Sequence, residues 1–268
     1  MKIVILYSGG MDSLAMLELA KENHKDDEIV LCHYDIGQPY AAKEMLSIKN
    51  STKKVDIRKV DWIRDDSGVV AKKSNPNAGR IFIPGRNLVL ATMAASAYLP
   101  DEIWMGGLKG EDNPGATDKN KEFVDRTNET MAYVFRPFSP VPKLVFPLVD
   151  KLWGKYNTAE YLFNKVGPEA ILKTSSCLSD TEGNCGTCIT CLKRNYMFKQ
   201  LGFEEKYEKH AMTDKNNVTM AIEMLKTDPD DKTAHYDKYR LQEIVPGLYI
   251  EYNTTDHDVI IKKLQELL

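Results

Sequence analysis

A glycine-rich segment near the beginning of the chain combines residue types that can hold a phosphate group. Residues Ser8–Ser13 read Ser-Gly-Gly-Met-Asp-Ser and lie between the apolar stretch Lys2–Leu6 and the helix-forming stretch Leu14–Ala20. At such a junction, exposed backbone N–H groups and the positive end of the helix dipole favour anionic oxygens. Paired glycines permit a sharp turn close to a ligand. The segment therefore predicts a nucleotide-phosphate site, with serine hydroxyls as donors and an aspartate that can hold a metal ion or a substrate group.

A purely structural turn is the alternative for Ser8–Ser13, because Gly-Gly is common in such turns and Asp-Ser is an ordinary helix start. The full pattern directly after an apolar strand is much more specific than Gly-Gly alone. It lacks the Gly-Lys-Ser/Thr ending of a Walker loop and the third glycine of a dinucleotide fingerprint. It resembles the pyrophosphate-binding loop of the ATP pyrophosphatases, which adenylate a carbonyl or carboxylate and release pyrophosphate.

Four of the five cysteines fall within fifteen residues, at Cys177, Cys185, Cys188 and Cys191. Two tight C-x2-C turns direct sulfurs to one point, and four thiolates suit a tetrahedral, structural Zn²⁺. In an intracellular chain such a cluster is more often a metal site than a disulfide framework. An iron–sulfur cluster and four unrelated buried thiols are the alternatives. The fifth cysteine, Cys32, lies in an apolar run and is expected to be a buried thiol.

The composition describes a mildly acidic chain that can bury a sizeable core. Its 268 residues are 43% hydrophobic and 28% charged, with a formal net charge of −3, which suits one large domain or a domain with an appendage. This balance argues against a general nucleic-acid or membrane-surface binder. No run is apolar enough to span a bilayer and no signal-peptide pattern is seen. We therefore expect a cytoplasmic protein with no membrane partner.

Strand and helix patterns alternate along the first part of the chain. We expect strands over residues 2–7, 28–34, 53–60 and 102–105, and helices over residues 14–23, 40–48, 87–99 and 119–133. Such alternation predicts an α/β fold with a doubly wound parallel sheet, in which ligands bind at the carboxyl ends of the strands. Ser8, Asp35 and Gly106 follow predicted strands and should therefore line one edge.

Three parts are expected along the chain: a nucleotide-binding α/β domain over residues 1–150, a helical and four-cysteine segment over 151–203, and a mostly helical extension over 204–268. The clearest helices of the extension are predicted over residues 220–226 and 259–268. Residues 65–80 are rich in Gly, Asn and Pro and predict a long loop, for which a substrate lid is a plausible role.

The ordered set of motifs resembles the 7-cyano-7-deazaguanine synthase family of the PP-loop ATP pyrophosphatases. The resemblance covers residues 1–203, and the segments that carry it are Tyr7–Ser13, Asp35–Gln38, Ile83–Asn87, Gly107–Asp118, Thr174–Cys177 and Cys185–Arg194. It implies a Rossmann-type, adenine nucleotide alpha hydrolase-like fold with a zinc-binding helical region. It also implies a ligase that uses ATP, Mg²⁺ and ammonia to convert 7-carboxy-7-deazaguanine into the nitrile through adenylated intermediates, and a homodimer.

The same resemblance assigns roles to residues of this chain. The catalytic residues are Asp12, Arg86, Asp112 and Asp118. The ATP-binding residues are Tyr7, Ser8, Gly9, Gly10, Met11, Asp12, Ser13, Leu14, Arg86 and Asn87. The substrate-binding residues are Gln38, Gly107, Gly115 and Asp118, and the zinc ligands are Cys177, Cys185, Cys188 and Cys191. A surface ion pair is the alternative for the arginine, and solvated loop acids are the alternative for the last two catalytic aspartates. His33, in a buried strand, is expected to be a core histidine.

Departures from the family pattern concentrate around the base-binding region. Pro39-Tyr40 stands where the family has Arg-His, Ala116-Thr117 where it has Tyr-Pro, and Leu178 where it has Tyr. These changes bear on the substrate more than on the ATP chemistry. Two further functions therefore stay open: a tRNA-thiolating ATP pyrophosphatase, and a deazaguanine-binding relative that stops at the amide or modifies another target. The acidic balance of the chain disfavours a nucleic-acid partner.

Overall fold

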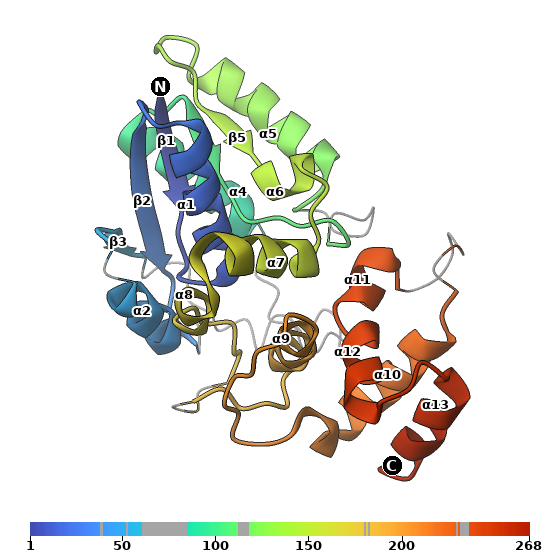
Figure 1. Cartoon of the computed structure of the whole chain (residues 1–268). Helices are drawn as coiled ribbons and strands as arrows, with labels where there is room; N and C mark the ends of the chain where they lie inside the picture. Colours follow the sequence, from blue (N-terminus) through green and yellow to red (C-terminus); the bar gives the residue numbers. More distant parts are fainter. Residues whose placement is uncertain are drawn as a thin grey trace.

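The fold centres on a parallel β-sheet, seen in a computed structural model (Figure 1). The structure describes residues 1–37, 40–51, 53–60, 85–111, 118–179, 181, 183–228, 230 and 236–268. Within these residues the sheet has the order β3-β2-β1-β4-β5, and every neighbouring pair is parallel. The strands are β1 (Lys2–Leu6), β2 (Glu28–Asp35), β3 (Asp56–Lys59), β4 (Glu102–Trp104) and β5 (Lys143–Val145). The predicted α/β fold with a parallel sheet is confirmed.

The central strand β1 is covered on both faces, which explains why its sequence is continuously apolar. Alternate side chains of a strand point to opposite faces. Ile3 and Ile5 accordingly pack in one hydrophobic cluster with α1 (Met11–Asn23) and α7 (Lys155–Val166). Val4 packs in another cluster on the opposite face. That second cluster includes side chains of α4 (Arg86–Tyr98) and α5 (Lys121–Val134).

The second half of the chain is mainly helical. Its helices are α6 (Pro147–Asp150), α7, α8 (Pro168–Leu172), α9 (Ile189–Gln200), α10 (Lys215–Lys226), α11 (Lys238–Gln242), α12 (Val245–Tyr252) and α13 (His257–Gln265), with a 3₁₀ turn over Ala211–Thr213. Residues 204–268, which we call the C-terminal extension, form a separate hydrophobic cluster with Leu192 and Tyr196 of α9. Figure 1 shows α10–α13 gathered at the lower right, away from the sheet. Helix α9 therefore joins the extension to the remainder of the molecule.

Most elements lie close to their predicted positions. The strand expected over residues 53–60 is shortened to β3, and β5 was not predicted. The helix expected over residues 40–48 is α2 (Ala41–Asn50). The loop predicted over residues 65–80 lies outside the described residues. In the described part of the chain no helix is both long and apolar enough to cross a membrane.

Candidate active site

The predicted phosphate loop joins the end of β1 to the start of α1 and has the conformation that its glycines allow. Gly9 has a φ of 75°, and a Cβ added to it would lie 3.0 Å from the Ser47 side chain. Both the backbone and the space therefore require glycine here. Gly10 is the N-cap of α1, and the Ser13 hydroxyl donates to its carbonyl oxygen at 2.9 Å. The loop thus presents the amino end of α1 at the sheet edge, as the sequence predicted.

Helix α2 holds the phosphate loop from the side. The buried Ser47 hydroxyl lies 2.6 Å from the Gly9 carbonyl oxygen and 2.8 Å from that of Lys173. The backbone N–H of Ser175 also donates to the Gly9 carbonyl, at 3.2 Å. Two segments that are far from Gly9 in the sequence, α2 and the stretch that includes Lys173 and Ser175, therefore hold Gly9 in place. Nothing in the glycine-rich pattern predicted the contribution of Ser47.

A cavity of about 260 Å³ opens at the carboxyl ends of β1, β2 and β4. Its walls include Ser8, Asp12, Ser13, Arg86, Asn87 and Gly106. The structure thus brings together the phosphate loop, the start of α4 and the end of β4, as expected. Asp35 ends β2 at this edge, as expected, but it does not line the cavity, and its carboxylate accepts a hydrogen bond from the Gly37 N–H at 3.0 Å. Strand β2 contributes Cys32, His33 and Tyr34 to the cavity in its place.

Asp12 is paired with a lysine that the sequence motifs did not indicate. The Lys155 ammonium lies 2.7 and 2.8 Å from the two carboxylate oxygens of Asp12. Lys155 is the first residue of α7 and stands 143 positions away in the chain. Both side chains are partly exposed, at 20% and 27%. The pair places a cation beside the phosphate loop, where it can meet phosphate oxygens, and a carboxylate that can meet a metal ion.

Arg86 and Asn87 begin α4, directly after Gly85, whose φ of 71° turns the chain into the helix. The Arg86 Nε lies 3.4 Å from the Asn87 Oδ1. The buried Asn87 amide donates to the backbone carbonyl of Asp118 at 3.0 Å. Arg86 therefore lines the cavity with a guanidinium that is anchored by its neighbour, and the backbone of Asp118 is tied to the same helix.

The structure describes only some of the remaining residues that were predicted to bind or act on the substrate. Gly107 follows Gly106 at the cavity edge and packs against Phe146, whose ring atom Cδ2 would lie 3.0 Å from an added Cβ. Its small size is thus required by packing. Gln38, Asp112 and Gly115 lie outside the described residues.

His33 lines the cavity as a buried and incompletely bonded side chain. It is 4% exposed, and its Nδ1 lies 3.2 Å from the Tyr7 carbonyl oxygen. Since a carbonyl only accepts, Nδ1 carries the proton and Nε2 of the neutral ring is an acceptor. Within the described residues Nε2 has no hydrogen-bond partner. Burial lowers the pKa of His33, while the bond to Tyr7 works in the opposite direction. The expectation of a core histidine holds for its burial, but one ring nitrogen stays available to a ligand.

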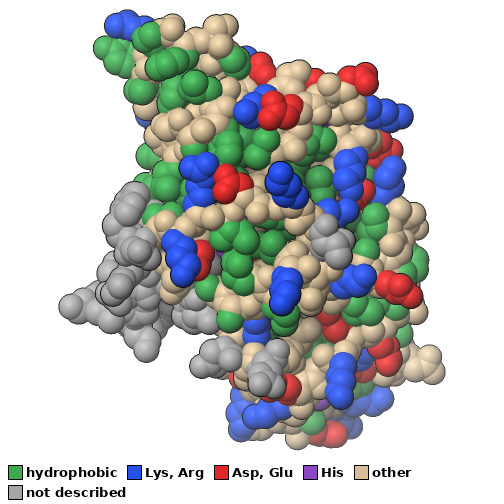
Figure 2. All heavy atoms as spheres, turned by 90° about the vertical axis from the view of Figure 1, so that its left-hand side faces the viewer, with side chains coloured by type: hydrophobic (Ala, Val, Ile, Leu, Met, Phe, Trp, Pro, Cys, Tyr) green, Lys and Arg blue, Asp and Glu red, His purple; other side chains and the backbone are tan. Residues whose placement is uncertain are grey.

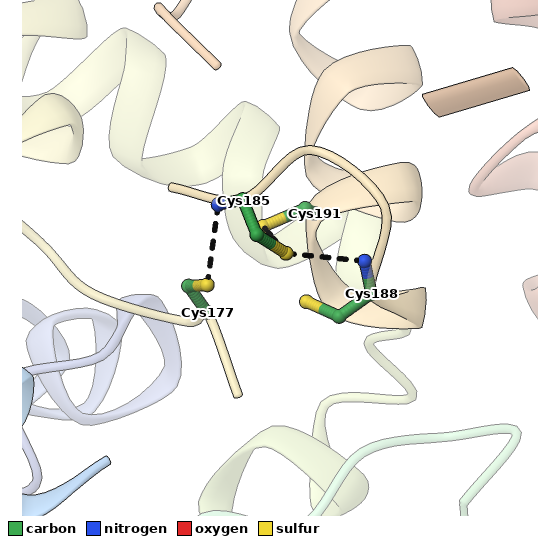
Figure 3. A group of neighbouring side chains, drawn as sticks. All are labelled: Cys177, Cys185, Cys188 and Cys191. Carbon is green, nitrogen blue, oxygen red and sulfur yellow. Dashed lines mark hydrogen bonds between the residues drawn. The ribbon is translucent and has the colours of Figure 1, made fainter. Parts of the chain in front are cut away.

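The four clustered cysteines converge on one point (Figure 3). All four sulfurs lie within 4.8 Å of one another. A tetrahedral site with Zn–S bonds of about 2.3 Å has edges of about 3.8 Å, and the sulfurs of Cys185 and Cys191 are 3.9 Å apart. Backbone N–H groups of Cys185 and Cys188 donate to cluster sulfurs at 3.4 and 3.3 Å, which favours thiolates. A hydrogen bond with Cys191 lowers the pKa of Cys188. The donor set therefore fits a tetrahedral metal.

Two basic side chains fix the cysteine loop to its surroundings. Lys43 of α2 donates to the Gly183 carbonyl at 2.7 Å and reaches the hydroxyl groups of Ser179 and Thr181. The fully buried Arg194 of α9 binds Glu205 at 2.7 and 2.8 Å, and also the Thr174 hydroxyl and the Ile171 carbonyl. Helix α2 thus contacts both the cysteine loop and the phosphate loop.

Comparison with known proteins extends over most of this architecture. The family model of queuosine biosynthesis protein QueC matches residues 2–202. A 7-cyano-7-deazaguanine synthase from Methanospirillum hungatei is 30% identical, over 76% of this chain and 98% of its own length. Synthases of the same name from Pyrococcus furiosus and Chlorobaculum parvum are 27% and 26% identical, over 72% and 80% of this chain and 90% and 99% of their own lengths. The family match ends before the C-terminal extension begins.

Proposed function

The chain belongs to the family of queuosine biosynthesis protein QueC, and on that premise we propose that it is an ATP-dependent ligase. Its substrates are 7-carboxy-7-deazaguanine and ammonia, and its product is 7-cyano-7-deazaguanine. The observation that carries this proposal is the cavity that the phosphate loop lines together with Arg86, beside the pair that Asp12 forms with Lys155. That arrangement suits the departure of pyrophosphate from a bound nucleotide, and the relatives named above make this product.

The reaction needs activation because a carboxylate does not react with ammonia. In the proposed sequence a carboxylate oxygen attacks the α-phosphorus of ATP, pyrophosphate leaves, and a mixed anhydride forms. Ammonia attacks the acyl carbon and AMP leaves, which gives the amide. The amide oxygen is adenylated by a second ATP in the same way. Loss of AMP and two protons then yields the nitrile. Each cycle therefore requires a group that binds triphosphate and a cavity that excludes water from the adenylate.

The phosphate end of the cavity supplies the positive charge and the hydrogen-bond donors that these reaction steps need. Backbone N–H groups of the loop and the Ser8 and Ser13 hydroxyls suit the β- and γ-phosphates. The Lys155 side chain can leave Asp12 and pair with those phosphates, because its ammonium already lies beside the loop. Arg86 can neutralise charge that develops between the α- and β-phosphates, which a guanidinium does well. Mg²⁺ bound with ATP supplies further neutralising charge, and Asp12 would hold it.

The base end of the cavity suits a planar heterocycle. Apolar side chains of Leu6, Ile36, Leu90 and Met105 line it, together with the His33 acceptor. We assign base recognition to Gln38, Gly107, Asp112, Gly115 and Asp118, as the family resemblance implies. The unusual Tyr40 also lines the cavity and is the first candidate for a residue that adjusts substrate choice.

Zn²⁺ at the cysteine cluster is proposed to be structural, because all four ligands come from the protein and no coordination position is left for a substrate.

We further propose a cytoplasmic homodimer. The end of α5 exposes apolar side chains at Tyr133 and Val134, and the turn that follows exposes Phe138, which suits a contact between copies. Light scattering during size-exclusion chromatography tests the oligomeric state.

One incubation tests the function. The protein is mixed with ATP, Mg²⁺, ammonium and 7-carboxy-7-deazaguanine, and products are identified by mass spectrometry while pyrophosphate is measured. We expect the nitrile with two pyrophosphates released per nitrile. Accumulation of the amide alone identifies an enzyme that stops at that stage. No pyrophosphate and no mass change would overturn ligase activity on this substrate.

A parallel arm with tRNA tests the thiolation alternative, at a stated salt concentration because binding to polyanions depends strongly on salt. Figure 2 shows Lys and Arg side chains interspersed with Asp and Glu over the face that lies on the left in Figure 1. Such a mixture attracts a polyanion less than a basic stripe does, so we expect no shift of tRNA.

A further inference from the structure

His33 lies at the carboxyl edge of the sheet, next to the phosphate loop. The pairing of β1 with β2 ends at Leu6 and Cys32, and His33 is one position beyond it on β2. Its ring is held against the end of β1, because Nδ1 donates to the Tyr7 carbonyl at 3.2 Å. Tyr7 directly precedes Ser8 of the phosphate loop, and His33 lines the same cavity as Ser8. The histidine therefore lies where parallel sheets bind their ligands.

One nitrogen of the His33 ring is buried without a partner. The side chain is 4% exposed, and among the described residues Nε2 makes no hydrogen bond. Leaving a buried polar atom unpaired costs free energy that an apolar residue at the same position would not lose. Such atoms in native proteins require an explanation, of which a missing ligand or water is one. Because His33 lines the cavity, a bound ligand can supply the partner of Nε2.

The tautomer of His33 decides which ligand groups can meet Nε2. With the proton on Nδ1, the Nε2 atom carries a lone pair and only accepts a hydrogen bond. Burial lowers the pKa of His33 and works against a second proton. Phosphate and carboxylate oxygens are acceptors too, so the triphosphate of ATP and the carboxylate of the substrate do not suit Nε2. The partner therefore has to be an N–H or an O–H group.

The surroundings of His33 favour the N–H group of an aromatic base. Cys32, Tyr34 and Ile36 are buried and line the cavity together with His33, and Leu6 of β1 extends this largely apolar lining. A flat aromatic ring gains free energy when it leaves water for such a surface. The hydroxyl groups of a sugar lose their hydration there and need further partners. A heterocycle therefore suits this part of the cavity better than a ribose does.

We propose that His33 is a base-recognition residue, whose Nε2 accepts a hydrogen bond from an N–H group of the heterocycle bound in the cavity. The ligand class is a purine or deazapurine with an exocyclic amino group, and ATP and 7-carboxy-7-deazaguanine both belong to it. The inference rests on the proposed function for the choice of these two ligands. It adds a side chain that recognises the base and that the sequence motifs did not indicate.

Two substitutions of His33 separate ligand recognition from support of the strand. Asn places its amide near the position of Nδ1, so His33→Asn keeps a donor for the Tyr7 carbonyl and removes the acceptor at Nε2. Gln places its amide near the position of Nε2, so His33→Gln keeps an acceptor and loses the donor to Tyr7. We expect His33→Asn to weaken ligand binding about tenfold and His33→Gln to stay within about threefold of wild type. A residue that only supports the strand gives the opposite order.

Equilibrium binding is measured by calorimetry with ligands that do not react. The first is an ATP analogue, given with Mg²⁺, in which a methylene group joins the α- and β-phosphorus atoms. The second is the same analogue with purine in place of adenine, which lacks the 6-amino group. The third is 7-carboxy-7-deazaguanine without a nucleotide. A loss in His33→Asn for the first ligand but not the second identifies adenine as the partner, and a loss for the third identifies the deazaguanine.

A control variant and a second measurement complete the test. His24→Asn is the matched control, because His24 is near the amino end of β2, with its Nδ1 2.9 Å from the Asp27 carboxylate. It should leave the binding of all three ligands unchanged. In wild-type protein, the ¹⁵N resonance of His33 Nε2 should shift when the recognised ligand binds, because the nitrogen lone pair then accepts a hydrogen bond. If His33→Asn does not fold, this resonance carries the test.

Four results would overturn the role of His33 alone. They are unchanged binding of every ligand in His33→Asn, a larger loss in His33→Gln than in His33→Asn, an equal loss in His24→Asn, and an Nε2 resonance that no ligand shifts. An equal loss for the adenine and purine analogues, with none for the deazaguanine, indicates a sugar hydroxyl and also overturns it. Wild-type protein that binds none of the three ligands overturns the proposed function and this inference together.

Discussion

The phosphate loop and the cysteine loop are both proposed to bind charged groups, but they are stabilised in different ways. Met11 and Ala15, just inside α1, are fully buried in the main hydrophobic cluster. The cluster around the cysteine loop consists of the cysteines themselves and Tyr207. Apolar burial therefore fixes the phosphate loop before any ligand binds, whereas the cysteine loop, on our proposal of a structural metal, depends on metal–sulfur bonds.

Because the two loops are held in place differently, substitutions in them should have different effects. Loss of a charged group in the phosphate loop should remove activity and leave the fold. Loss of a cysteine should remove the fold of its loop first. The two failures are not fully separate, because α2 contacts the phosphate loop through Ser47 and the cysteine loop through Lys43.

The largest expected effect concerns the metal. Cys188→Ser should lose zinc and lower the free energy of unfolding by ~4 kcal/mol or more, since metal binding is folding energy in such a site. Thermal melting and metal content of the purified protein measure it. Cys32→Ser, outside the cluster, serves as the control and should retain zinc. An unchanged melting temperature would contradict a structural metal, and iron with visible absorption after anaerobic purification would contradict zinc.

Asp12→Ala should reduce pyrophosphate release by ~10²–10³-fold, because the loop loses its candidate metal ligand and Lys155 loses its partner. The melting temperature should change little, since the Asp12 side chain is partly exposed. The exposed Asp125 of α5 offers a control, as Asp125→Ala removes a carboxylate far from the cavity lining. Normal turnover of the Asp12 variant would remove this residue from the mechanism.

Ser47→Ala tests whether α2 supports the phosphate loop. The buried hydroxyl bonds the Gly9 and Lys173 carbonyls, so its loss should cost ~1–2 kcal/mol of stability. It should also raise the KM for ATP a few-fold by loosening Gly9. The control Thr130→Ala deletes a hydroxyl that bonds only within its own helix. If stability falls but the KM for ATP does not change, the hydroxyl supports the fold alone.

The smallest expected effect is a pH dependence from His33. Its pKa is lowered in the folded protein from the ordinary value of 6.5, so the unfolded chain binds the proton more readily. This contribution to stability is therefore full above pH 6.5 and is lost as the pH drops towards the folded pKa. His33→Asn should flatten this decline in urea unfolding at pH 5–7. The exposed His210→Asn is the control, and equal slopes in wild type and His33→Asn would refute the assignment.

The sequence by itself determined what short segments can encode. Ser8–Ser13 placed the phosphate loop because a strand, two glycines and a helix start are contiguous. Fifteen residues contain the four clustered cysteines, so their convergence follows from local turns such as the one at Gly186, whose φ of 82° favours glycine. The parallel sheet followed from the alternation of strands and helices.

Which partners the basic side chains near the phosphate loop and the cavity segments would find was decided only by the tertiary structure. Lys155 reaches Asp12 across 143 positions, and Arg240 reaches Gly110 across 130. Each is an ordinary basic residue near a helix start, and no local pattern distinguishes it from the many solvated lysines and arginines of the chain. Their partners are set by how α7 and α11 pack, and packing depends on shapes and volumes summed over distant segments. The sheet edge was therefore predictable, whereas the electrostatic network that equips it for chemistry was not.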